Sequence, residues 1–163
     1  EAGHAYIEAN HALIRPALER GDREAAWAAF GRLTHTAQDF YAHSNYITLY
    51  LARRRDLSAS PPDPEQVDPL DPDLIASPDL RSGRLYYPLE ALTFIPGLER
   101  LVQPLLPRDS HAWMNLDSPA RGPKFAYAFA AAVRRTQYEF GRVRENLPRP
   151  LFLRFTDLPP GQG

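Results

Sequence analysis

Apolar residues near the start of the chain recur at a helical spacing. Over residues 2–15 they are mixed with good helix formers, and the pattern predicts a helix. Proline lacks a backbone N–H and clashes with the preceding turn, so we expect Pro16 to end or kink this helix at Arg15. The apolar positions are Ala5, Ile7, Ala12 and Leu13.

A longer helical pattern follows and runs to three arginines at positions 53–55. Asp22 is suited to cap the N-terminus of this helix. The negative charge of Glu24 in the first turn interacts favourably with the positive end of the helix dipole. The pattern predicts one uninterrupted helix from Asp22 to the arginines. Its apolar positions are Ala26, Phe30, Leu33, Ala37, Phe40 and Ile47.

Residues 56–83 have a different composition, with prolines at positions 61, 62, 64, 69, 72 and 78. Prolines at this density block both helices and paired strands. We interpret the segment as a long loop, and as a tolerated insertion rather than a functional loop. We therefore expect deletion of most of residues 58–78 to leave the helical framework intact.

The second half of the chain predicts short helices broken at Pro96 and Pro104, and then a long helix that begins after Pro123. We expect an extended tail that packs back onto the body through Leu151, Phe152, Leu153 and Phe155. The fold class that follows is all-α: one domain, residues 1–163, built as a small helical bundle with a Pro-rich loop.

Charge and composition exclude several classes of partner and site. The chain has 163 residues, a net charge of -1 and no cysteine. We therefore expect no stable complex with nucleic acid and no thiolate ligand to a metal. No apolar run approaches the roughly 20 residues that span a bilayer, so we expect no transmembrane segment. We favour a secreted or periplasmic location.

The five histidines carry the main chemical signal. His35, Asp39 and His43 are four residues apart, and this spacing places them in one row along a helix. His4, Glu8 and His11 form a second such row. The connection between the two helices is short, which favours antiparallel neighbours whose rows face each other in the bundle interior. In the absence of thiols, imidazole and carboxylate are the ligands that zinc, manganese and iron accept.

The length of the rows predicts more than one ion. His35 and His43 are separated by roughly 12 Å of helix rise, which is too far for both to reach one ion from a straight helix. Asp39 can bridge two ions or act as a base, and Glu8 can do likewise or act on a bound water. His111 and Asp117 are further candidate ligands. Three alternatives stay open: Glu8 as a surface acid, His11 as a solvated residue and Asp117 as a turn residue.

The stretch THTAQDFYAHSNYI, positions 34–47, resembles the signature of proteins related to the heterokaryon-incompatibility protein HET-C. That group is distantly similar to zinc-dependent phospholipases C and single-strand-specific nucleases. HAWMNLDSP from position 111 and GHAYI from position 3 are similar to further segments of these families. The resemblance implies a phospholipase C-like bundle in which the metal ligands are His4, His35, Asp39 and His43, completed by His111 and Asp117.

We therefore expect a metal-dependent hydrolase of phosphate esters that holds two or three zinc ions, with manganese, iron or calcium as alternatives. Its substrate would be a phospholipid or another phosphodiester, reached by peripheral contact with a membrane. The alternative is a metal-stabilised HET-C-like toxin or interaction module without turnover. A di-iron oxidase fits poorly, because this chain lacks the Glu-x-x-His pairs of such bundles.

Overall fold

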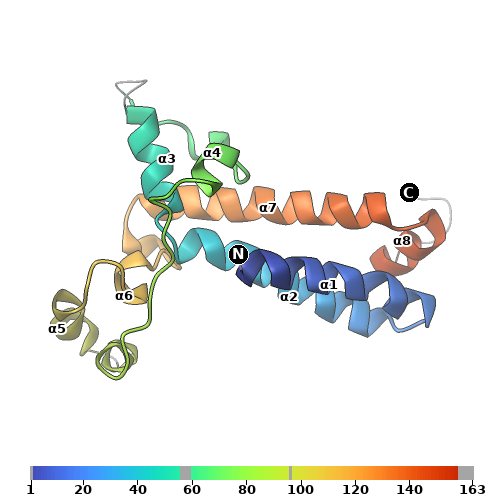
Figure 1. Cartoon of the computed structure of the whole chain (residues 1–163), viewed down its shortest axis with the longest axis horizontal. Coiled ribbons are helices and arrows are strands. Elements are labelled where there is room, and N and C mark those ends of the chain that lie inside the picture. The colour runs from blue at the N-terminus through green and yellow to red at the C-terminus, as the bar shows by residue number, and fades with distance from the viewer. Residues whose placement is uncertain (1, 56–59, 96, 158–163) are drawn as a thin grey trace. The chain divides into compact units, whose positions relative to one another are not determined.

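The computed structural model describes residues 2–55, 60–95 and 97–157. Within these ranges the chain is all-α, with helices joined by turns and no extended strand (Figure 1). The long helices are α1 (Ala2–Glu19), α2 (Arg23–Ala42), α3 (Tyr46–Arg55), α7 (Lys124–Asn146) and α8 (Arg149–Thr156). The short α-helices are α4 (Pro72–Ile75), α5 (Glu99–Val102) and α6 (His111–Met114), and the 3-10 turns are η1 (Pro64–Gln66), η2 (Leu89–Phe94), η3 (Gln103–Leu105) and η4 (Pro119–Arg121).

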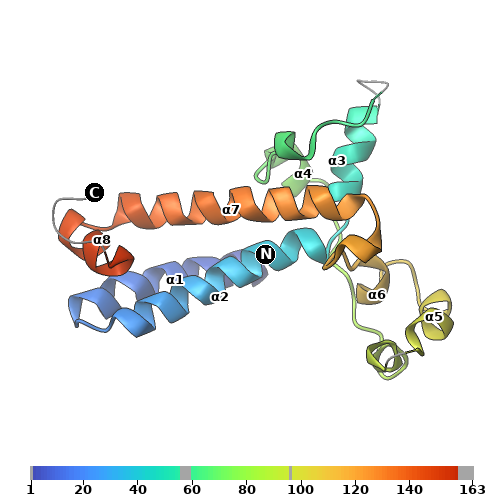
Figure 2. The same ribbon diagram turned by 180° about the vertical axis from the view of Figure 1, so that it is seen from behind.

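The chain divides into two compact units, and the number of independent domains stays a prediction. The first unit contains residues 1–38 and 133–163, and the second contains residues 39–132. In the first unit, α1 lies beside α2, and α8 follows the end of α7 (Figure 2). Its core is a single apolar cluster that includes Ile7, Ile14, Leu18, Leu33, Val143 and Phe155.

The N-terminal helix is longer than the sequence predicts. Pro16 lies inside α1, which continues to Glu19. Ala17 and Leu18, just after the proline, are buried in the core, and their burial favours one more helical turn over the loss of one hydrogen bond. The predicted cap of the next helix is confirmed, because the Asp22 carboxylate accepts a hydrogen bond from the N–H of Ala25 at 3.0 Å.

The C-terminal residues also differ from the prediction. Residues 149–156 form the helix α8 and not an extended tail, and residues 158–163 lie outside the described part of the chain. Prolines at positions 148 and 150 stand just before the helix and in its first turn, where a missing N–H breaks no helical hydrogen bond. The predicted packing is confirmed for three of the four side chains: Phe155 is buried, and Leu151 and Phe152 lie against the same core. Leu153 is half-buried and is not part of that core.

The predicted long second helix is interrupted. α2 ends at Ala42 and α3 begins at Tyr46, so residues 43–45 lie outside both helices. In this gap Ser44 forms a β-bridge with Ser82, and the N–H of Asn45 donates to the carbonyl of Arg81 at 3.0 Å. The prediction of one continuous helix was wrong because a segment nearly forty residues away in the sequence captures these backbone groups.

Residues 60–83 of the Pro-rich segment contribute to the core of the second unit, contrary to the expectation of a dispensable insertion, and residues 56–59 lie outside the described part of the chain. Val67 and Leu74 are buried in a cluster with tyrosines and alanines of α2, α3 and α7. Asp63 and Asp71 cap the short helices η1 and α4, each of which has proline in its first turn. Proline therefore starts helical turns here, where it was expected to prevent them.

Four tyrosine hydroxyls hold the backbone of this segment. Tyr41 donates to the carbonyl of Pro69 at 2.6 Å and Tyr46 donates to that of Asp68 at 2.6 Å. The other two bonds join Tyr50 to Gln66 at 3.2 Å and Tyr127 to Pro62 at 2.7 Å. The tyrosines satisfy carbonyl groups that a segment without regular secondary structure leaves unpaired.

The predicted short helices are observed as η2, α5 and η3, but their predicted breaks are not confirmed. The break expected at Pro96 lies outside the described residues, and Pro104 lies inside η3. As predicted, α7 begins directly after Pro123. Among the described residues, no helix is both long and apolar enough to cross a bilayer.

Candidate functional site

The eight predicted ligands divide between the two units. His4, Glu8, His11 and His35 belong to the first unit, and Asp39, His43, His111 and Asp117 belong to the second.

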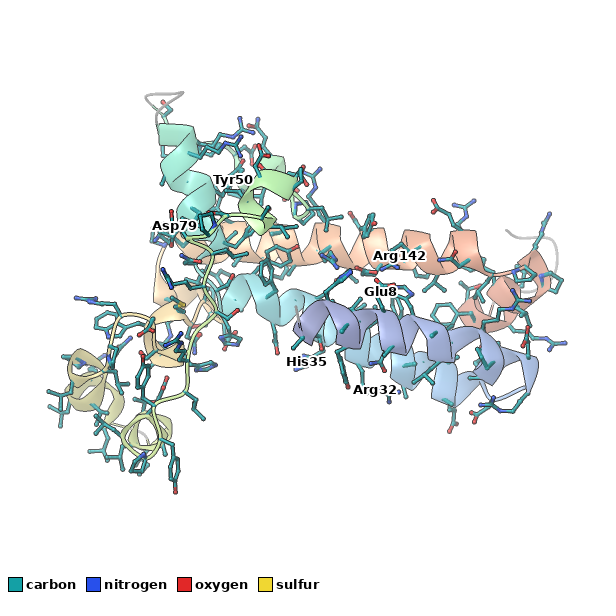
Figure 3. All side chains as sticks on the ribbon, viewed as in Figure 1. Glu8, Arg32, His35, Tyr50, Asp79 and Arg142 are labelled. Carbon is teal, nitrogen blue, oxygen red and sulfur yellow. The ribbon has the colours of Figure 1, made fainter. Side chains whose placement is uncertain are left out.

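In the first unit the two histidine rows do not face each other in the interior. His4 and His35 are both exposed to solvent, so the expected interior position was wrong for them. The carboxylate of Glu8 accepts two hydrogen bonds from Arg142 of α7, each of 2.8 Å, and Figure 3 shows the two side chains together. This pairing with Arg142 lowers the pKa of Glu8.

His11 is part of a buried charge network that the sequence analysis missed. Its Nε2 atom lies 2.6 Å from Oε2 of Glu139, whose side chain is fully buried. Arg135 donates to the other carboxylate oxygen at 2.6 Å, and Arg142 donates to Oε2 at 3.1 Å. Burial alone would raise the pKa of Glu139, but the hydrogen bond from His11 and the arginine charges hold that pKa at about 2.

A sequence signal for this network exists in retrospect. Glu139 stands four residues after Arg135 and three before Arg142, so all three share one face of α7. The apolar pattern of α7 places that face toward the core, where a carboxylate requires partners. The sequence alone did not show that His11 supplies one of them.

In the second unit the structure brings together three of the four predicted ligands. The rings of His43 and His111 stack with centroids 4.3 Å apart and an interplanar angle of 25°. Nε2 of His43 lies 3.4 Å from Oδ1 of Asp117. Asp39 is one helical turn before His43, whose N–H donates to the Asp39 carbonyl at 2.8 Å. We call the set of His43, His111 and Asp117 the histidine cluster.

Residues 82–84 lie between the segment that carries His43 and the segment that carries His111, and they hold the two segments together. Ser82 bridges to Ser44 on one side, and Arg84 bridges to Ser110 on the other. Between them, the N–H of Gly83 donates to the carbonyl of His43 at 2.8 Å. A Cβ atom on Gly83 would lie only 2.9 Å from Cα of His111, so the close approach requires glycine.

A second buried carboxylate, also missed from the sequence, supports His111. Glu90 is fully buried, and its Oε1 atom accepts a hydrogen bond from the N–H of Ala112 at 2.5 Å. Its Oε2 atom accepts from the N–H of Tyr86 at 2.7 Å. Oε1 also lies 4.0 Å from Nδ1 of His111. Glu90 therefore fixes the first turn of α6, which carries His111.

Within the described ranges, no three histidine, aspartate or glutamate side chains are arranged as a ready metal site. Comparisons with protein-family models, with curated proteins and with solved structures gave no match. Metal ligation and the resemblance to HET-C-related proteins therefore stay predictions.

Proposed function

We propose that the chain is a zinc-dependent hydrolase of phosphate esters whose centre is the histidine cluster of the second unit. One observation carries this proposal: two imidazoles from distant segments stack at 4.3 Å, and an aspartate oxygen lies 3.4 Å from one of them. A metal centre in a folded domain draws such nitrogen and oxygen donors from different segments of the chain.

The donor atoms suit zinc. Imidazole nitrogen and carboxylate oxygen are its usual ligands in a protein without cysteine. In the proposal His43, His111 and Asp117 hold the ion. When bound, zinc would polarise a phosphate oxygen and lower the pKa of a coordinated water. Glu8 and His11 are assigned no role at the ion, because their side chains are engaged with Arg142 and Glu139.

The chain's own residues would divide the remaining work. Glu90, by holding the first turn of α6, keeps the His111 ring against His43. Asp39, one turn before His43, is the proposed base that accepts a proton from the attacking water. Asp117 is exposed at the edge of the cluster, where solvent and substrate have access.

Metal content in protein without a histidine tag tests the binding step. We expect zinc to bind the wild-type chain, and His43→Ala and His111→Ala to reduce that binding strongly. His35→Ala is the comparison, because His35 is exposed in the first unit, and it should retain the ion. Loss of zinc in all three variants would contradict a centre confined to the second unit.

Turnover is measured separately, as release of headgroup from phospholipid vesicles and of chromophore from a phosphodiester. Zinc, manganese and calcium are each loaded at several pH values. Activity that His43→Ala abolishes and His35→Ala spares supports the hydrolase. Bound metal without turnover under any condition would instead favour the metal-stabilised interaction module.

A further inference from the structure

A groove in the first unit lies between α1 and α7 and has a volume of about 420 Å³. Half of the side chains that line it are apolar, and the polar ones include His11 of the buried charge network. Small-molecule sites in proteins have volumes of roughly 300–1,000 Å³ and combine apolar walls with a few placed polar groups. The apolar lining residues are Ala12, Ile14, Pro16, Val143 and Leu147.

The imidazole of His11 is held in a defined orientation at this groove. Its Nε2 atom lies 2.6 Å from Oε2 of Glu139, which is fully buried. Glu139 is ionised at neutral pH because its pKa is about 2, so its oxygens accept hydrogen bonds and donate none. Nε2 of His11 is therefore the nitrogen that carries the proton. In the neutral ring the other nitrogen, Nδ1, is a hydrogen-bond acceptor.

Nδ1 of His11 is accessible from the groove. The side chain is 10% exposed, and the residue is part of the groove lining. Within the described part of the chain, the hydrogen bond of this ring runs through Nε2, and Nδ1 is not a buried atom left unsatisfied. A ligand in the groove can therefore donate a hydrogen bond to an acceptor that the protein has already oriented.

The charged side chains of the groove are paired with one another or with neighbours. Glu8 accepts two hydrogen bonds of 2.8 Å from Arg142, and the two side chains are labelled in Figure 3. Arg142 also donates to Glu139 at 3.1 Å, and Arg15 donates to Glu19 at 2.8 Å. An anionic or cationic ligand would have to break one of these pairs to gain a partner. The pairing favours a ligand without formal charge.

We propose that this groove is a binding site for a neutral, mainly apolar small molecule that donates one O–H or N–H hydrogen bond to Nδ1 of His11. The apolar part of the ligand lies against Ile14, Val143 and Leu147. The amide of Asn146 also lines the groove and can donate or accept a second hydrogen bond. The site does not depend on the proposed zinc centre, because its residues all belong to the first unit.

A matched series of ring compounds tests the ligand class by NMR titration of the full chain at about pH 8. p-Cresol carries a hydroxyl donor, and 4-methylanisole has the same ring and oxygen without the donor. We expect p-cresol to bind roughly fivefold more tightly than 4-methylanisole, because one hydrogen bond is lost. The anion p-toluate and the cation 4-methylbenzylammonium should both bind more weakly than p-cresol. Equal binding of p-cresol and 4-methylanisole, or tightest binding of either ion, overturns the proposal.

Two exposed alanines of α1 provide a blocking variant and its control. Ala12 lines the groove, so Ala12→Phe should fill it and abolish p-cresol binding. Ala9 is exposed on the same helix and does not line the groove, so Ala9→Phe should bind p-cresol as the wild type does. Circular dichroism verifies the fold of both variants. Binding that survives Ala12→Phe, or that is lost equally in both variants, overturns the proposal.

Nitrogen NMR of the His11 ring tests the geometry directly. His11→Gln removes the ring and thereby identifies its signals among those of the five histidines. We expect the proton of the neutral ring on Nε2, and we expect the Nδ1 signal to shift when p-cresol is added. A proton on Nδ1 at about pH 8, or an Nδ1 signal that p-cresol leaves unchanged while it binds, overturns the assignment of His11 as the acceptor.

Discussion

Nε2 of His11 lies 2.6 Å from Oε2 of Glu139, although 128 positions separate the two residues. This contact joins α1 to α7 across the core of the first unit. It belongs to a network in which Arg135 and Arg142 bind the same carboxylate. The Glu139 side chain is fully buried, so the network determines whether that negative charge stabilises the fold or destabilises it.

Stability should therefore fall in acid. Folding lowers the pKa of Glu139 from 4.5 to about 2. A carboxyl group whose pKa is lowered by folding stabilises the folded state at pH values above its unfolded pKa. For Glu139 this contribution is lost as pH falls from about 4.5 toward about 2. The loss is on the order of 3 kcal/mol. The lowered pKa of Glu8 acts in the same direction.

Urea unfolding between pH 2 and pH 7 measures this effect. Glu139→Gln should destabilise the chain at neutral pH by roughly 3 kcal/mol, because arginines lose their buried partner. Glu139→Gln should also make the unfolding free energy depend less on pH in the acid range. Glu145→Gln, at an exposed position on the same helix, is the control. An unchanged acid profile in Glu139→Gln would contradict the assignment.

Gly83→Ala should disrupt the histidine cluster. The added Cβ would meet Cα of His111 at 2.9 Å and its nitrogen at 3.2 Å, and backbone atoms cannot move aside cheaply. We expect a loss of roughly 1–3 kcal/mol in unfolding free energy. Gly31→Ala is the matched control, since nothing lies within 4 Å of the added atom. That change in the middle of α2 should stabilise by up to about 1 kcal/mol. Equal effects of the two substitutions would refute the steric argument.

Leu74→Ala tests whether the Pro-rich segment is part of the core. Leu74 is 5% exposed and packs in the cluster of the second unit, whereas the adjacent Ile75 is 44% exposed. Truncation of Leu74 should cost about 2–4 kcal/mol, and that of Ile75 should cost less than about 1 kcal/mol. Thermal melts of the two variants decide the question. Near-equal melting temperatures would restore the interpretation of a dispensable insertion.

Tyr46→Phe removes the hydroxyl that binds the carbonyl of Asp68 without changing the size of the ring. Burial raises the pKa of this tyrosine, as expected for a hydroxyl that stays protonated in the core. We expect a loss of about 1 kcal/mol, because the carbonyl is left without this donor. Tyr87→Phe, at a position that is 81% exposed, should be neutral. If Tyr46→Phe also leaves the unfolding free energy unchanged, the prediction is contradicted and water replaces the lost hydrogen bond to the Asp68 carbonyl.

The local pattern of the sequence determined much of the helical framework. The apolar spacing and the proline before it predicted α7, and the Asp22 cap and the start of α2 followed from side-chain chemistry next to the backbone. These helical features depend on neighbours within a few positions, which a sequence displays directly. His43, His111 and Asp117 were named among eight candidate ligands, but nothing in the sequence separated these three from the other five.

Tertiary structure decided the rest. α2 ends at Ala42 because Ser44 bridges to Ser82, and no residue near position 43 requires that break. Glu139 has a low pKa because His11 reaches it from another helix. Val67 becomes a core residue because tyrosines from three helices hold the surrounding carbonyls. Each outcome depends on groups that are far apart in sequence, and the free energy of such contacts exists only once the chain has brought them together.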